Sequence, residues 1–190
     1  MKKVIYFALV SLCLFSCSQP KNGSANYKVI EVVDSIISLY PNVYVNDVQN
    51  EQFCQSLRSE LDKRLAEDNT FLQEIPMQFR QMLKNNNGMY IIKFECGEYT
   101  TNDKKLESPN SHVAINFAIF AEVDEDFASK LEDKAIYTVT GKYNSYVDWK
   151  LVLPSGDVFS YPTICRSYSN YDKDVCLGGF LFSDLQVIKK

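Results

Sequence analysis

The stretch VAINFAIFAEV, at residues 113–123, decides the fold class of this chain. Every second residue of the stretch is apolar, and successive side chains of a β-strand point to opposite faces. The stretch therefore predicts a long strand with one strongly apolar face. Residues 89–96 alternate in the same way and predict a second strand beside it.

Residues 124–133 follow the long strand and predict a short helix, because Phe127 and Leu131 recur at helical spacing. Its opening acids, Asp124, Glu125 and Asp126, suit the positive end of a helix dipole. Further short apolar runs predict strands at residues 135–143, 149–153, 158–161, 177–182 and 185–188. Together they predict a mostly antiparallel β domain over residues 89–190, with one short helix.

Residues 28–88 have a helical period instead. Phe53, Leu57, Leu61 and Leu65 form one stripe on an otherwise charged segment, and residues 30–40 carry a shorter stripe. Residues 77–84 continue the helical spacing, and the sequence Asn-Asn-Asn-Gly at residues 85–88 would end that helix. The chain is therefore predicted to be an α+β protein, with N-terminal helices followed by the β domain.

The second half of the chain resembles the OB-fold-like domains of exported bacterial proteins. The resemblance lies in the short helix, in the strand around residues 137–142, and in the Gly-rich closing strand that ends Leu-Gln-Val-Ile at residues 185–188. It implies a small barrel, in which Gly141 lets its strand bend. The alternative from the residues alone is an open antiparallel sheet or a sandwich packed on the helices.

The first sixteen residues predict a secretory signal peptide. Lys2 and Lys3 precede an uncharged apolar run at residues 4–15, which is the order of such leaders. A membrane-spanning helix needs about 20 apolar residues, and this run is shorter. The segment is therefore expected to be removed from the mature chain.

Leu14-Phe15-Ser16-Cys17 closes this leader and resembles the lipobox of bacterial lipoproteins. The resemblance implies that Cys17 becomes the first residue and carries diacylglycerol and a further acyl chain such as palmitate. Phe15 departs from the pattern, which usually has a smaller residue there. Ser18, where inner-membrane retention would need Asp, favours the outer membrane in a host with two membranes. The alternative is a secreted protein without lipid.

Residues 17–27 are rich in turn-forming residues and predict a flexible tether between the lipid and the folded chain. Cysteines beyond Cys17 suit a compartment that permits disulfides. Cys165 with Cys176 is the favoured pair, which leaves Cys54 with Cys96. The alternative is that Cys54 and Cys96 are small buried apolar residues.

The sequence has no recognisable catalytic signature. His112 is the single histidine, so any imidazole base would have to be this residue at the start of a strand. No phosphate-binding Gly-rich loop and no Cys-x-x-Cys pair occurs, and no cofactor or metal is expected. A formal net charge of −4 with no basic cluster argues against a nucleic-acid partner.

Aromatic residues are the one enrichment. Tyr143, Tyr146, Tyr168 and Tyr171 stand among Asn, Ser and Asp, as is typical of surfaces that bind a sugar or a protein. The alternative is that aromatic residues in this region pack in or over the core. A lipid-anchored, noncatalytic binding or structural module of the cell envelope is the preferred function, with a protein or carbohydrate partner. The alternative is an envelope enzyme, or an enzyme inhibitor, whose site the sequence hides.

Overall fold

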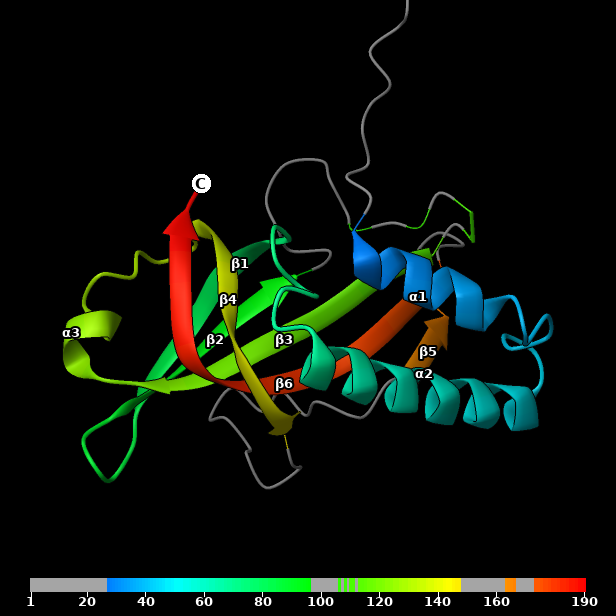
Figure 1. The fold of residues 1–190 in the computed structure, drawn as a ribbon, viewed down its shortest axis with the longest axis horizontal. Coiled ribbons are helices and arrows are strands. Elements are labelled where there is room, and N and C mark those ends of the chain that lie inside the picture. The colour runs from blue at the N-terminus through cyan, green and yellow to red at the C-terminus, as the bar shows by residue number, and fades with distance from the viewer. Residues whose placement is uncertain are drawn as a thin grey trace, which may run out of the picture.

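A computed structural model describes residues 27–96, 106, 108, 110–111, 113–147, 163–166 and 173–190 of the chain, with the backbone alone at 163–166 and 173 (Figure 1). The predicted leader, Cys17, most of the tether and the expected strands at residues 149–153 and 158–161 lie outside these residues. The helices and strands are α1 (Lys28–Ile37), α2 (Asp47–Glu67), β1 (Pro76–Lys84), β2 (Tyr90–Cys96), β3 (Val113–Val123), α3 (Glu125–Ala128), β4 (Ile136–Tyr146), β5 (Thr163–Arg166) and β6 (Lys173–Lys189).

β3 is the long strand that the alternating stretch predicts. Its alternate residues are all buried: Val113, Ile115, Phe117, Ile119, Ala121 and Val123. The opposite face of β3 is also largely covered, because Ala118 and Phe120 are 0% and 1% exposed. β3 pairs antiparallel with β2 and parallel with β6, so it has a strand on each side as well as a buried face.

Strand pairing closes a ring. β1 pairs with β2 and β4, and β4 pairs with β6, all antiparallel, while the parallel β3–β6 pair completes the circle of five strands. β5 is added outside this ring, antiparallel to β6. The predicted α+β class with a mostly antiparallel sheet is therefore confirmed.

Gly141 lies where β4 approaches β6 closely. A Cβ atom at this position would stand 2.8 Å from the backbone oxygen of Ser183. The β4–β6 register shifts between Thr140 and Lys142, and Asp184 opposite takes a positive φ of 50°. An added residue in a pair of strands bends them, so the expected bend at Gly141 is present as a bulge with a close backbone contact.

The two long helices lie side by side along one side of the sheet (Figure 1). The buried residues of α2 are the four of its predicted stripe, Phe53, Leu57, Leu61 and Leu65. α1 buries five aliphatic residues in a core that is continuous with the inside of the ring. The side chain of Asn46 caps α2 by accepting a hydrogen bond from the backbone N–H of Gln49 at 3.0 Å.

The prediction of helix at residues 77–84 is wrong, because this segment is β1. Asn85 and Gly88 form a hairpin turn here, in which Asn85 N–H donates to the Met89 carbonyl at 2.8 Å and Gly88 takes a φ of 87°. A glycine with a positive φ is favourable in a three-residue hairpin loop as well as at the end of a helix. The helical segment therefore ends at Glu67, and the β domain begins at Pro76 rather than at residue 89.

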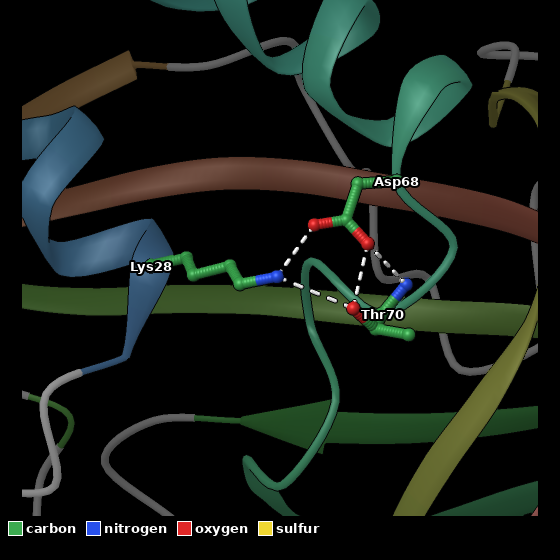
Figure 2. Close-up of polar contacts among 3 residues, drawn as sticks. All are labelled: Lys28, Asp68 and Thr70. Carbon is green, nitrogen blue, oxygen red and sulfur yellow. Dashed lines mark hydrogen bonds and ion pairs between the residues drawn. The ribbon is translucent and has the colours of Figure 1, made fainter.

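A polar clamp ties the beginning of α1 to the end of α2 (Figure 2). Lys28 Nζ lies 2.6 Å from Asp68 Oδ2 and donates to Thr70 Oγ1 at 3.2 Å. Thr70 in turn donates to Asp68 Oδ1 through both its backbone N–H and its hydroxyl. Hydrogen bonds from Lys28 and Thr70, chiefly, lower the pKa of Asp68 from 3.8 to about 2.

Candidate interaction surface

Tyr143 and Tyr146, predicted as ligand-binding residues, lie together on β4 with their rings 6.4 Å apart. Both rings contact Phe180 of β6, at 6.2 and 5.1 Å between centroids. On the other side lies α2, with the Arg58 guanidinium 5.1 Å from the centre of the Tyr146 ring. We call these three aromatic residues, with Arg58 and Asp62, the aromatic seam. Tyr168 and Tyr171 lie outside the described residues.

The aromatic seam joins α2 to the ring. Tyr143 Oη donates a hydrogen bond of 2.5 Å to Asp62 Oδ1, and Arg58 Nε lies 4.0 Å from Asp62 Oδ2. Burial, and after it the hydrogen bond to Asp62, raises the pKa of Tyr143. Burial also raises the pKa of Tyr146. These contacts give the two tyrosines a packing role, and their binding of a ligand stays a prediction.

The predicted disulfide between Cys54 and Cys96 is wrong. Cys96 is a buried free thiol at the end of β2, and burial raises its pKa to about 12. Burial, and after it the charge of Cys96, raises the pKa of Tyr27, the residue that precedes α1. Cys54 is placed elsewhere, on α2, where its thiol contacts Asn50 Oδ1 at 3.5 Å.

The pairing of Cys165 with Cys176 stays a prediction, because the side chain of Cys165 lies outside what the structure describes. The backbone register pairs Cys165 with Asp174, and Cys176 with Thr163. The two cysteines are therefore diagonal neighbours on adjacent strands. Diagonal neighbours stand about 7–8 Å apart, and disulfides usually join Cα atoms closer than about 7 Å.

His112 also lies outside the described residues, but its neighbour Ser111 belongs to a polar cluster. Asp34 on α1 accepts hydrogen bonds from Ser108 Oγ, from Ser111 Oγ at 2.6 Å and from Asn110 Nδ2 at 3.0 Å. Ser108 is fully buried. The cluster fastens the segment before β3 to α1, which is a structural use of the carboxylate.

A second polar cluster spans β1 and β2. Glu95 Oε1 lies 2.5 Å from Lys93 Nζ, and its Oε2 accepts a hydrogen bond of 2.8 Å from Arg80 Nε. Arg80 also donates to Gln78 Oε1 at 2.9 Å. Lys93 is only 2% exposed, and a buried ammonium needs such a partner because transfer from water is costly. The carboxylate thus bridges two cations at the place where the β1–β2 register shifts, between Phe79 and Gln81.

Exposed large apolar side chains are concentrated in one stretch of the described sequence. Among the described residues, five large hydrophobic side chains are exposed, and three of them lie within ten residues of sequence: Leu39 at 69%, Val45 at 73% and Val48 at 64%. The other two, Met82 and Ile188, are isolated in the sequence. We call residues 38–48, the connection between α1 and α2 together with the first two residues of α2, the helical tip.

The helical tip is held in shape by its own hydrogen bonds. Val43 N–H donates to the Tyr40 carbonyl at 3.0 Å, and Val45 and Asn46 donate to the Asn42 carbonyl at 3.0 and 2.9 Å. Asn42 N–H donates to Gln49 Oε1 at 2.9 Å, which ties the turn to α2.

Val43 points inward from this turn and is 1% exposed, whereas Val45 points outward. Below the turn, Tyr40 Oη shares a hydrogen bond of 2.7 Å with Ser56 Oγ of α2, and its ring meets Phe53 edge-on. The apolar side chains of the helical tip therefore stand on a fixed base.

The sequence patterns did not identify the helical tip. The stripe of α1 ends near Tyr40, and the stripe of α2 begins at Phe53. Leu39, Val45 and Val48 fall outside both stripes. Apolar residues that lie outside the buried stripe of a helix are expected to be exposed, and this was the sequence signal that could have identified them.

The described residues contain no group of three or more His, Cys, Asp or Glu side chains that could hold a metal ion. Within the same residues, no helix combines the length and apolarity needed to cross a membrane. No protein-family model, no curated protein and no solved structure matches this chain.

Proposed function

We propose that this chain is a lipid-anchored protein of the cell envelope, and that it acts without catalysis by docking a partner protein on its helical tip. Acyl chains on Cys17 would hold it at the membrane, with the outer membrane favoured in a host that has two. The ring of strands would serve as the rigid base that presents the tip.

The leader and the lipobox-like residues 14–17 support the location. Each CH₂ group of an acyl chain that enters the bilayer contributes about 0.8 kcal/mol, so two or three long chains would anchor the protein durably. α1 begins at Lys28, directly after the tether, and has 10 residues. At a rise of about 1.5 Å per residue, α1 is about 15 Å long, so the tip lies at its far end from the tether.

The order of the strands supports the OB-like resemblance. Three consecutive antiparallel strands, a short helix after the third, and a last strand that closes the ring beside β3 are present together. OB-fold domains commonly act as binding modules. The fold alone does not determine a chemical activity. The resemblance therefore agrees with a binding role and does not name the ligand.

The docking proposal depends on one observation. Leu39, Val45 and Val48 are exposed on or beside a hydrogen-bonded turn. Isolated exposed apolar residues are normal, but a cluster of them on a rigid element marks an interaction site. These three side chains bury only a minor part of their surface in the folded chain. Contact with a partner would remove them from water.

Location is tested by Cys17→Ala with fractionation of the host envelope. We expect the variant to leave the membrane fraction, and the wild-type N-terminus to carry acyl mass. An unchanged distribution and a lipid-free wild-type N-terminus would together contradict the anchor.

Docking is tested by recovering the lipid-tethered protein from detergent-treated envelope with its bound proteins. We expect a specific partner with wild type and its loss with Leu39→Ser/Val45→Ser/Val48→Ser. The control is Met82→Ser/Ile188→Ser, which removes the other two large exposed hydrophobic side chains of the described residues. Equal recovery of the partner by both variants would show that the helical tip does not dock it.

A further inference from the structure

We infer that the partner of the helical tip is a cationic amphipathic protein segment, one that offers apolar side chains flanked by Lys or Arg. This inference rests on the proposed function. It assigns the chemistry of the partner from the charges that surround the exposed apolar residues.

The sequence of the helical tip and of the adjoining helix turns contains acidic residues and no basic ones. No Lys or Arg occurs from Val29 to Leu57, a span that covers the tip and the adjoining turns of both helices. Asp47 and Glu51 are the exposed acids of this region on α2, in its first turn and one turn further. An apolar surface with this border attracts a partner of positive charge.

The nearest basic residues along the chain lie beyond the helical tip and are engaged. Lys28 is at the opposite end of α1, in the clamp with Asp68 at 2.6 Å. Arg58 lies over the ring of Tyr146 in the aromatic seam. Neither can neutralise Asp47 or Glu51 by a direct ion pair, because each is held at another contact. The negative charge therefore stays beside Val45 and Val48.

The same charges argue against two other occupants. Apolar residues that insert into an anionic membrane are normally accompanied by Lys and Arg, and the helical tip has acids in their place. A second copy of this chain is also acidic, with a formal net charge of −4 and a pI near 5.1, so self-association would bring like charges together. A cationic segment satisfies both the apolar and the acidic parts of the surface.

The experiment uses the full chain with Cys17→Ala, so that no acyl chain adds membrane affinity. Three probes are compared: a labelled model helix of Leu and Lys, the same helix with Glu in place of Lys, and vesicles that contain phosphatidylglycerol. We expect the Leu/Lys helix to bind at least about tenfold more tightly than the Leu/Glu helix, and its binding to weaken as ionic strength rises. We expect no binding to the vesicles.

Charge reversal identifies the acids that act. Asp47→Lys/Glu51→Lys should weaken binding of the Leu/Lys helix by about tenfold or more. The matched control, Asp126→Lys/Asp133→Lys, makes the same change in net charge around α3, at the other end of the long axis (Figure 1). It should change binding by less than about twofold, because exposed charges far apart are screened by salt.

Three results would overturn the inference: equal weakening by both double variants, equal binding of the two helices, or preferential binding to the anionic vesicles. Sedimentation of the protein alone tests whether a second copy of the chain binds the tip, and a dimer that is lost with Val45→Asp would also overturn the inference.

The proposed function fails separately. If the triple serine variant keeps the envelope partner, the tip is not the docking site; if it loses the partner but the charge-reversed variant keeps it, only the cationic assignment fails.

Discussion

The aromatic seam and the helical tip both place large side chains on α2 or beside it, but they use them in opposite ways. In the seam, Phe180 is fully buried, and the rings of Tyr143 and Tyr146 pack between it and α2. In the tip, Val45 and Val48 are mostly exposed to solvent. A concentration of aromatic residues in the sequence thus marks a packing contact, while a short aliphatic turn marks the exposed surface.

The largest expected effect is in the seam, with Phe180→Ala. Phe180 also contacts Phe117 inside the ring at 5.9 Å between centroids. Removing a buried aromatic ring should lower the free energy of unfolding by about 3–5 kcal/mol, as measured by urea denaturation. Phe180→Leu keeps most of the volume and should cost less than about 2 kcal/mol. A small effect of Phe180→Ala would mean that the seam does not hold α2 to the ring.

A smaller effect should follow Tyr143→Phe, which removes only the hydroxyl that donates to Asp62. We expect a loss of about 1 kcal/mol in the free energy of unfolding, because the ring keeps its packing. Asp62→Asn should give a loss of similar size, and the double variant should lose less than the sum. Strict additivity would contradict the contact.

The clamp of Figure 2 gives a pH dependence of modest size. The folded-state pKa of Asp68 is depressed to about 2, so its contribution to stability is complete above the unfolded-state pKa and is lost as the pH falls through about 2. Because the ion pair is partly exposed, we expect only about 0.5–1 kcal/mol. Asp68→Asn should remove this part of the acid dependence in urea titrations between about pH 5 and pH 2, and an unchanged profile would contradict the clamp.

The smallest change in stability per substituted residue should come from Leu39→Ser/Val45→Ser/Val48→Ser. Exposed substitutions usually change the free energy of unfolding by no more than about 0.5 kcal/mol each, in either direction. Val43→Ser, two residues from Val45 but 1% exposed, should cost about 2 kcal/mol because it puts a hydroxyl into the core. If the triple variant is the less stable of the two, the tip residues serve the fold.

Regular periodicity let the sequence predict α1, α2, β2 and β3 at nearly their observed positions. β1 was missed for a physical reason. Its register shifts between Phe79 and Gln81, so Phe79 and Met82 share a face although they are three residues apart. A bulge puts two residues of one strand opposite one of its neighbour. It therefore gives a strand the three-residue spacing that is typical of a helix.

The candidate site could not be predicted in the same way. Val43 and Val45 are the same residue type two positions apart, and which of them faces the core depends on the hydrogen bonds that close the turn from Tyr40 to Asn46. Those bonds follow from how α1 and α2 meet over the ring. Local sequence does not encode that meeting, since it is set by packing between distant segments.

Site-specific photo-crosslinking in the living host tests the central claim most directly. A benzophenone side chain would be placed at position 45, with position 133, shortly after α3 in the sequence, as the control. We expect a discrete adduct with another protein from position 45 that position 133 does not give. The same adducts from both positions, or none from position 45 in fully folded protein, would contradict the claim.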